Sequence, residues 1–320
     1  MSRQGKCRVS ATDGDSLPDR RGDAPKRSPW VVIVAVVVVA ILVVGAAAWL
    51  TVQSGSKKSE YTKRNWVVIV GNANFTAANG VIGGSGNASD PYVIANWDID
   101  ASNSVGIYIE NTDAHYIIRD CYVHGGSASR YNKQVGIWLE NSSNGILDSN
   151  DCSRDLAGIV LVESSNNTVV NNTCDSNDQN GIAISSSNNN TLIGDKCSSN
   201  GRWGLILESS HNNIVCSNAI LHNAVFGIGI DPDRGQPSTR NRLWNNTFIG
   251  NNGAGSKYGP RHIQANDSGT GNWWNSTNGY GNYWSDWTTP DVAPQYGIVD
   301  LPYNIAGSAG AKDYYPLTKP

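Results

Sequence analysis

A short phrase returns through the middle of the chain: GIWLENSSN at 136–144, GIVLVESSNN at 158–167, GIAISSSNNN at 181–190, GLILESSHNN at 204–213 and GIGIDPDRG at 227–235. The interval between copies is 22 or 23 residues, and an earlier copy, GIYIENTDA, begins 30 residues before the first of these, at Gly106. Self-similarity at such a period predicts a solenoid, in which stacked repeats build one continuous core.

Each repeat predicts three short strands. The residues one and three after each glycine are aliphatic, and this period of two is typical of a strand with one buried face. A second apolar column follows eleven residues after the glycine, and a third follows sixteen after it. The second column is Leu147, Val169, Leu192 and Val215, and the third is Cys152, Cys174, Cys197 and Ile220. Asn, Ser and Gly turns separate the columns, so we expect an all-β, right-handed parallel β-helix.

A polar column lies between the second and third apolar columns. It consists of Asp120, Asn150, Asn172, Asp195 and Asn218, fourteen residues after each glycine. Amides stacked one strand spacing apart can hydrogen-bond along the axis, so this column predicts a buried ladder at a turn. The cysteines form a similar stack of Cys121, Cys152, Cys174 and Cys197. Packing is the favoured reading because the same position also holds Ile220, while a disulfide between adjacent coils and a soft-metal site are the alternatives.

The chain before the repeats divides by composition. Residues 1–29 form a polar tail typical of disorder, residues 30–52 an uncharged run long enough for one transmembrane helix, and residues 53–65 a linker. A cleaved signal peptide ending near residues 46–48 is the alternative to an anchor. Residues 66–104 are expected to form an N-terminal cap and first coil, residues 105–265 the repeats, and residues 266–320 a closing segment.

The uncharged run and the sequons favour a cell-membrane protein with a single span and most of its chain outside the cell. Residues 1–64 contain 11 basic and 5 acidic side chains, whereas residues 65–320 contain 13 and 22. A domain with this acidic balance disfavours nucleic acid as a partner. The glycosylation sequons begin at Asn74, Asn87, Asn141, Asn166, Asn171, Asn189, Asn245, Asn266 and Asn275.

The two ends of the domain carry a family resemblance. The opening FTAANGVIGGSGNASDPYVIANWDIDAS (75–102), the repeats of the form SSNNTVVNNTC (164–174) and the endings GNYWSDW (281–287), YGIVDLPYNI (296–305) and DYYPL (313–317) resemble the NosD-type right-handed β-helix family, particularly its membrane-anchored or secreted archaeal members. The likeness covers about residues 67–317. It implies a parallel β-helix at the cell surface, related to folds that bind or act on polysaccharides. The founding branch of the family assists copper delivery to nitrous oxide reductase, so a metalloenzyme accessory protein is one implied role.

Metal sites have little support in the residues themselves. Copper prefers His, Met or Cys side chains clustered in space, but the only Met is Met1 and the five histidines share no column. Relatives often carry an Asp-rich stretch before the final GI-x-D-x-PY phrase, which would suit calcium. Here that stretch retains only Asp291 and Asp300. We therefore expect no cofactor, with calcium as the alternative.

Candidate function concentrates on the outer side of the first strands. Tyr108 and Trp138 lie two residues after their glycines, and Glu110 and Glu140 lie four after them, so both pairs should face solvent together. Aromatic rings beside carboxylates suit a sugar chain. We therefore expect a carbohydrate-binding or structural protein, with Tyr108 and Trp138 as binding residues. The alternative is that the solvent-facing carboxylates, Glu110 and Glu140 among them, serve only to keep the sheet soluble.

An enzyme is the second hypothesis for this face. Glu110 and Glu140, one coil apart, could serve a glycoside hydrolase. The phrase Asp231-Pro232-Asp233-Arg234 is similar to the Asp-Pro-His-Asp site of β-helical mannuronan epimerases and related lyases, with Asp231, Asp233 and Arg234 as the catalytic candidates. The histidine that would act in proton transfer is missing from this phrase, which puts that activity in doubt.

Overall fold

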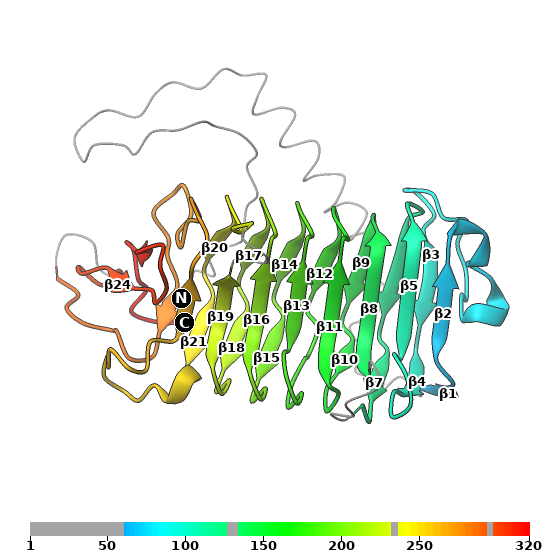
Figure 1. The fold of residues 1–320 in the computed structure, drawn as a ribbon, viewed down its shortest axis with the longest axis horizontal. Coiled ribbons are helices and arrows are strands. Elements are labelled where there is room, and N and C mark those ends of the chain that lie inside the picture. Colours follow the sequence, from blue (N-terminus) through cyan, green and yellow to red (C-terminus); the bar gives the residue numbers. More distant parts are fainter. Residues whose placement is uncertain (1–60, 127–133, 232–235, 293–296) are drawn as a thin grey trace, which may run out of the picture. The chain divides into compact units, whose positions relative to one another are not determined.

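The computed structural model describes residues 61–126, 134–231, 236–292 and 297–320, which belong to one compact unit, Glu60–Pro320. Parallel strands stack in successive coils along one axis (Figure 1). The regular structure described outside the strands consists of three short 3₁₀ helices, η1 (Asn72–Asn74), η2 (Ala77–Asn79) and η3 (Asn251–Gly253). The described part of the chain is therefore the parallel β-helix expected from the repeat.

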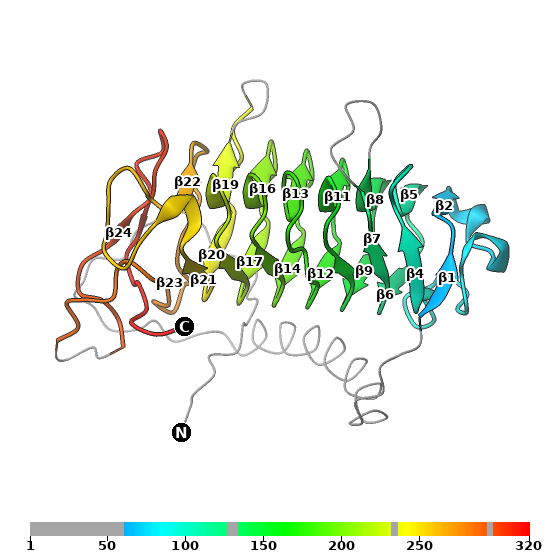
Figure 2. The same cartoon turned by 90° about the horizontal axis from the view of Figure 1, so that it is seen from below.

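The first sheet has eight strands and runs the length of the β-helix (Figure 2). Its order is β2 (Val67–Val70), β5 (Ile107–Thr112), β8 (Val135–Ser142), β11 (Ala157–Val162), β13 (Ile182–Ser185), β16 (Trp203–Glu208), β19 (Phe226–Asp231) and β22 (Ala265–Asp267).

The second sheet has seven strands. Its order is β3 (Tyr92–Ala95), β6 (Tyr116–Arg119), β9 (Gly145–Asp148), β12 (Thr168–Val170), β14 (Thr191–Ile193), β17 (Ile214–Cys216) and β20 (Arg242–Trp244).

The third sheet consists of two four-stranded parts. One part is β1 (Thr62–Arg64), β4 (Trp97–Asp100), β7 (Tyr122–His124) and β10 (Asp151–Cys152), and the other is β15 (Lys196–Ser198), β18 (Ala219–Leu221), β21 (Thr247–Ile249) and β23 (Tyr283–Trp284). Single bridges from Thr173 to Asp151 and to Lys196 join the two parts. A separate antiparallel pair, β24 (Tyr303–Asn304) and β25 (Lys312–Asp313), lies in the closing segment.

The apolar columns of the sequence become the core because the strands pair in register. Ile159 lies opposite Ile137 on one side and Ile182 on the other, and Leu192 lies opposite Val169 and Val215. The side chains of these columns are fully buried. Burying one such aliphatic side chain stabilises the fold by about 1.5–3 kcal/mol, and each coil adds several. The stack of coils therefore supplies the core that no single repeat could form.

The expected asparagine ladder runs through the turn between the second and third sheets. The Nδ2 group and the backbone N–H of Asn150 both donate to the Oδ1 of Asn172, each at 2.9 Å. The Nδ2 group of Asn150 also donates to the carbonyl of Ile118 in the preceding coil, at 2.9 Å. The ladder contains Asn150, Asn172, Asp195, Asn218, Asn246 and Asn282, all buried. Each amide thus bonds the turn of one coil to the turns on both sides.

Asp120 does not belong to this ladder, contrary to the sequence prediction. Arg119 pairs with Asp148, and the backbone N–H of Cys121 donates to the Oδ1 of Asn150 at 3.1 Å. The cause is a longer turn, because three residues separate β5 from β6 whereas two separate β8 from β9. Counting from the glycine therefore places this coil one residue out of register.

The same shift corrects the cysteine stack. Cys152, Cys174 and Cys197 are free, fully buried thiols, and Cys197 pairs with Ile220. Val123, rather than Cys121, pairs with Cys152 and continues the column. Cys121 lies at the ladder turn, where burial raises the pKa of its thiol to about 12. Burial also raises the pKa values of Cys152 and Cys174 well above the ordinary value.

Two further amide ladders and a serine ladder were not anticipated. One amide ladder is Asn167, Asn190, Asn213, Asn241 and Asn272, between the first and second sheets. The other is Asp155, Asn177, Asn200, Asn223, Asn251 and Gln264, after the third sheet. The serine ladder is Ser142, Ser164, Ser187, Ser210 and Ser238. The signal was present in the sequence, since their repeat-region members also recur every 22 or 23 residues.

Each amide ladder ends at an aspartate in the C-terminal segment. Asn282 donates to Asp313, Asn272 to Asp267 and Gln264 to Asp286. The same three carboxyl groups each accept a further hydrogen bond from an aromatic side chain. Trp284 donates to Asp313, Trp274 to Asp267 and Tyr303 to Asp286. Amide N–H groups point toward this end of every ladder, so the last one needs an acceptor, and a carboxylate offers several acceptor positions.

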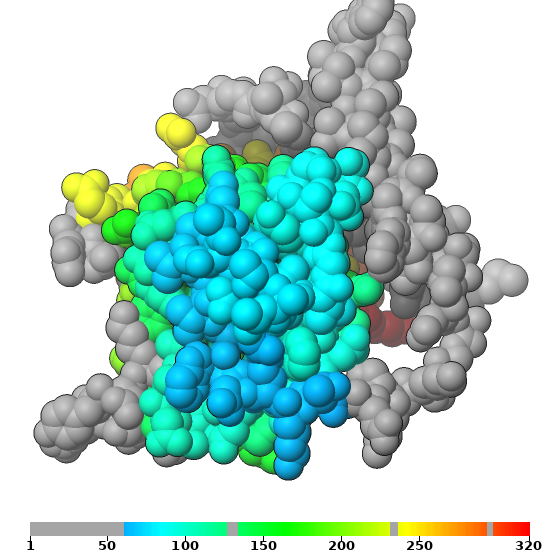
Figure 3. Space-filling view, turned by 90° about the vertical axis from the view of Figure 1, so that its right-hand side faces the viewer, coloured from blue at the N-terminus to red at the C-terminus, as the bar shows by residue number. Residues whose placement is uncertain are grey.

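The N-terminal end is covered by the first described residues, coloured blue to cyan in Figure 3. Phe75 enters the core there, stacking on Tyr92 with ring centroids 4.6 Å apart. Strand β1 lies inside the segment expected to be a linker and pairs with β4. No described helix is long and apolar enough to span a bilayer, and the span expected at residues 30–52 lies outside the described residues.

Candidate functional site

The outer face of the first sheet carries two columns of side chains in its N-terminal half. The first column is mainly apolar or aromatic and consists of Val68, Tyr108, Trp138, Val160 and Ala183. The second column contains Val70, Glu110, Glu140, Val162 and Ser185. These residues alternate with the buried ones, which is why they face away from the core. An aromatic pair thus lies beside an acidic pair on the adjacent strands β5 and β8.

Tyr108 and Glu140 are hydrogen-bonded across these two coils. The Oη of Tyr108 donates to the Oε2 of Glu140 over 2.9 Å. Burial, followed by this hydrogen bond, raises the pKa of Tyr108 well above its usual value, so its phenol keeps its proton. Tyr108 lies opposite Trp138, and Glu110 lies opposite Glu140. The structure therefore brings together four of the residues that the sequence marked as candidates.

A depression of about 630 Å³ adjoins this group. It begins at the turn directly after Glu110, where the Nδ2 of Asn111 donates to the Oε1 of Glu110 over 3.1 Å. The Nδ2 of Asn141 in turn donates to the Oδ1 of Asn111 over 2.7 Å. The complete lining is Asn72, Asn111, Thr112, Asp113, Asn141, Ser142, Ser143, Glu163 and Ser165. These side chains offer carboxyl, amide and hydroxyl groups, which suit a ligand rich in hydroxyl groups.

The other catalytic candidates lie elsewhere or outside the described residues. Asp231 ends strand β19, where its backbone pairs with Glu208. Asp233 and Arg234 lie outside the described residues. Strand β19 is four strands from β8 in the sheet order, or on the order of 20 Å away. Asp231 and the pair of Glu110 and Glu140 therefore belong to different parts of the first sheet.

A second polar group on the third sheet escaped the sequence analysis. His124 Nε2 lies 2.9 Å from Asp98 Oδ1, and the His124 ring stacks on Tyr122 with centroids 4.3 Å apart. Tyr61 reaches over the same side, with its ring centroid 5.9 Å from that of Tyr122. Of these residues, Tyr61 and Tyr122 line a depression of about 490 Å³. Nothing in the repeat marks them, because they come from coils whose outer residues differ.

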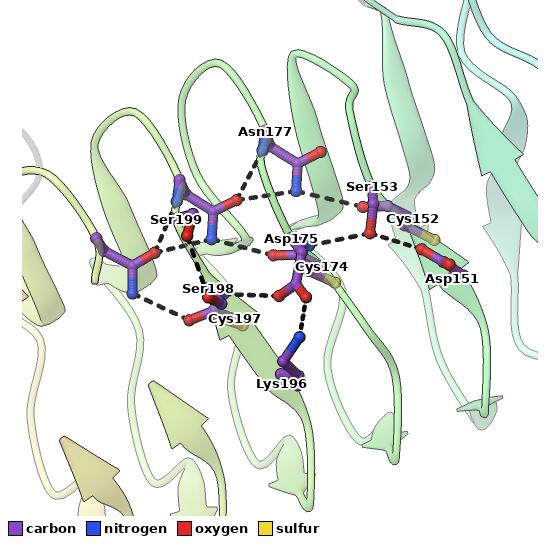
Figure 4. Close-up of polar contacts among 12 residues, drawn as sticks. Asp151, Cys152, Ser153, Cys174, Asp175, Asn177, Lys196, Cys197, Ser198 and Ser199 are labelled. Carbon is purple, nitrogen blue, oxygen red and sulfur yellow. Dashed lines mark hydrogen bonds and ion pairs between the residues drawn. The ribbon is translucent and has the colours of Figure 1, made fainter. Parts of the chain in front are cut away.

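Further along the third sheet, polar side chains bond to one another (Figure 4). Ser153 donates to Asp151 over 2.6 Å, and the backbone N–H of Asp175 donates to Ser153 over 3.1 Å. Asp175 accepts from Lys196 and from the backbone N–H of Ser198. The carboxylates here are engaged within the protein, and this network extends the strand pairing where the sheet is held by single bridges.

The residues present do not fit a copper ion. Among the described residues, no three His, Cys, Asp or Glu side chains form a group that could hold a metal. The stacked thiols lie in an apolar core, and burial disfavours the thiolate form that binds soft metals. The two calcium candidates instead bond to their own loop: Gly297 donates to Asp291, and Val292 donates to Asp300.

Solved β-helix structures resemble this chain at low identity. The periplasmic alginate epimerase AlgG shares 20% identity over 57% of this chain and 45% of its own, with a TM-score of 0.39. The mannuronan C-5 epimerase AlgE4 A-module of Azotobacter vinelandii shares 15% identity over 57% of this chain and 59% of its own, with a TM-score of 0.38. Pectate lyase Pel9A shares 13% identity over 76% of this chain and 73% of its own, with a TM-score of 0.36. The chain spans about half the length of the two epimerases.

Sequence comparison gives the family. No curated protein matches the chain. The family described as periplasmic copper-binding protein (NosD) matches residues 120–289, which is more than half of the chain. The protein therefore belongs to the NosD family.

Proposed function

We propose that this protein binds a polysaccharide along the N-terminal half of its first sheet. The observation that carries the proposal is the group formed by Tyr108, Trp138, Glu110 and Glu140 on adjacent coils, next to the hydroxyl- and amide-lined depression. Aromatic rings offer flat apolar surfaces to pyranose faces, and carboxylates accept hydrogen bonds from sugar hydroxyls.

The spacing of the coils supports this ligand. Adjacent parallel strands lie about 4.8 Å apart, which is similar to the length of one pyranose residue in an extended glycan. A glycan lying along the helix axis would therefore present successive sugars to Tyr108 and Trp138. Nothing in the chemistry of this group requires a cofactor.

The experiment is a binding screen of the chain against immobilised neutral, acidic and amino polysaccharides. The screen should use a fragment beginning at residue 60, because β1 pairs with β4 and belongs to the fold. Retention of at least one glycan, lost in Trp138→Ala, is the expected result. If no glycan is retained, or if the Trp138→Ala variant is retained equally, the proposal fails.

Glycoside hydrolysis is the second candidate for the same face. Glu110 and Glu140 are register neighbours, and retaining glycosidases place their two carboxyl groups about 5–5.5 Å apart. Tyr108 would hold Glu140 in place through its hydrogen bond. Release of reducing sugar ends that stops in Glu110→Gln would support this role, and binding without release would exclude it for the glycans tested.

We also propose a cell-surface location with residues 30–52 as the anchor, on the strength of their uncharged sequence. The full chain should sediment with membranes after carbonate washing, and a chain lacking residues 30–52 should not. Release of the full chain by that wash would contradict an anchor.

A further inference from the structure

The candidate glycan face is acidic in its described part. Glu110 and Glu140 lie in its second column, and Asp113 and Glu163 line the adjoining depression. The lining residues named above include no Lys, Arg or His. A ligand on this face therefore meets four carboxyl groups and no basic side chain from that lining.

Such a face discriminates among sugar chains by charge. A chain of uronic acids would bring one carboxylate per residue against Glu110 and Glu140, and like charges at this spacing repel. A neutral chain would gain only stacking and hydrogen bonds. A chain with ammonium groups would gain charge-assisted hydrogen bonds as well, which are shorter and stronger than neutral ones.

The two glutamates are also spaced for a repeating cation. They are register neighbours on adjacent strands, about 4.8 Å apart at the backbone. Consecutive amino sugars of an extended chain can bring one ammonium group to each coil while their ring faces lie on Tyr108 and Trp138. Glu110 in addition accepts a hydrogen bond from Asn111, which lines the depression.

We propose that the ligand of this face is a glycan with free amino groups, a polymer of amino sugars. This inference rests on the proposed glycan binding and adds the class of sugar. A basic peptide shares the charge but lacks flat apolar ring faces that match an aromatic pair repeated at the coil spacing. The occupant favoured by the charges and the rings together is the amino-sugar chain.

The test uses the full chain in a detergent without a sugar headgroup, so that the detergent does not compete. The ligands are labelled β-1,4-linked glucosamine oligomers, their fully N-acetylated counterparts, oligouronates and oligolysine. Measurements at mildly acid pH are made at about 50 mM and about 500 mM NaCl, because screening weakens exposed charge pairs. The glucosamine oligomer should bind about tenfold more tightly than the acetylated one at low salt, and the difference should shrink at high salt.

One variant tests the contribution of charge on this face, and a second variant serves as its control. Glu140→Gln keeps an acceptor for Tyr108 but removes one of the four charges, so it should reduce the preference for free amines while acetylated oligomers still bind. Asp148→Asn makes the same charge change on the second sheet, in β9, and should leave the preference intact.

The outcomes distinguish this inference from the proposed function. Equal binding of free and acetylated oligomers, or tighter binding of oligouronates, would overturn the amino-sugar assignment and leave glycan binding in place. If none of the glycans binds, both the amino-sugar assignment and the proposed glycan binding are overturned. Oligolysine binding that equals glucosamine binding and is unchanged in Trp138→Ala would overturn the assignment in favour of a basic peptide.

Discussion

Tyr108 donates a hydrogen bond of 2.9 Å to Glu140, which lies one coil further along the β-helix. The bond joins the first of the two outer columns of the first sheet to the second, and Asn141, the residue directly after Glu140, lines the polar depression. It orients one carboxyl group and one ring of the candidate site relative to each other.

Replacing Trp138 should weaken glycan binding more than replacing the Tyr108 hydroxyl. Trp138→Ala removes a whole stacking surface, so we expect the dissociation constant to rise at least about tenfold, or about 1.4 kcal/mol. Tyr108→Phe keeps the ring and should change it by less than about threefold. Titration calorimetry checks both, with Tyr280→Ala as the control for an exposed ring in the closing segment. Equal losses in all three variants would place the ligand elsewhere.

Asp195 should make the stability of the β-helix fall as the pH rises. Its neighbour Asn172 donates Nδ2–H to it, but an ionised Asp195 has no side-chain hydrogen to pass on to Asn218. Burial raises the pKa of Asp195 to about 7, above the unfolded value of about 3.9. The stability from the protonated form is therefore complete below about pH 4 and lost as the pH rises through about 7.

Asp195→Asn should accordingly stabilise the protein at pH 8 by on the order of 2–4 kcal/mol and have much less effect at pH 4. Thermal unfolding across this pH range measures the difference. Burial also raises the pKa of Asp155, to about 8, so this residue too lowers the stability as the pH rises. The Asp195→Asn variant keeps this second contribution. A variant with the same pH profile as the parent would show that Asp195 does not control this fall.

The corrected register makes a prediction that separates two neighbouring positions. Asn150 lies in the ladder and bonds to Asn172, so Asn150→Leu should lower the free energy of unfolding by about 1–3 kcal/mol by leaving buried groups unpaired. Asp120 lies outside the ladder at a positive φ of 50°, which asparagine also accepts, so Asp120→Asn should change it by less than about 0.5 kcal/mol. Denaturant unfolding measures both variants, and an unchanged free energy of unfolding in Asn150→Leu would contradict the place of Asn150 in the ladder.

The stacked thiols should resist modification in the folded protein. Cys152, Cys174 and Cys197 are fully buried, so a thiol reagent should leave them unlabelled until the protein is denatured. Mass spectrometry of digested samples, labelled before and after denaturation, locates the reagent. Rapid labelling of Cys174 under native conditions would contradict its place in the core.

Much of the fold could be read from the sequence because each turn and strand recurs at one interval. The apolar columns that begin at Ile137 and Leu147 are confirmed by the strand pairing. The error at Asp120 arose because one extra turn residue leaves the hydrophobic pattern almost unchanged while shifting every later position. Spacing from the glycine carries no information about turn length in a coil that departs from the repeat.

The candidate site could be read only in part for a related reason. Tyr108 and Glu110 face outward by the alternation of a strand, so their association with the next coil follows from the repeat. The His124 and Asp98 pair depends on which side chains happen to meet across two irregular coils, and no periodic signal marks it. Contacts between coils that break the repeat require the structure.

The most direct test of glycan binding by the first sheet is a crystal structure of the protein with a bound oligosaccharide. The account predicts a sugar chain parallel to the helix axis, with successive rings against Tyr108 and Trp138 and polar groups within hydrogen-bonding distance of Glu110 and Glu140. A sugar chain bound instead beside Tyr61 and Tyr122 on the third sheet, with the first sheet bare, would contradict it.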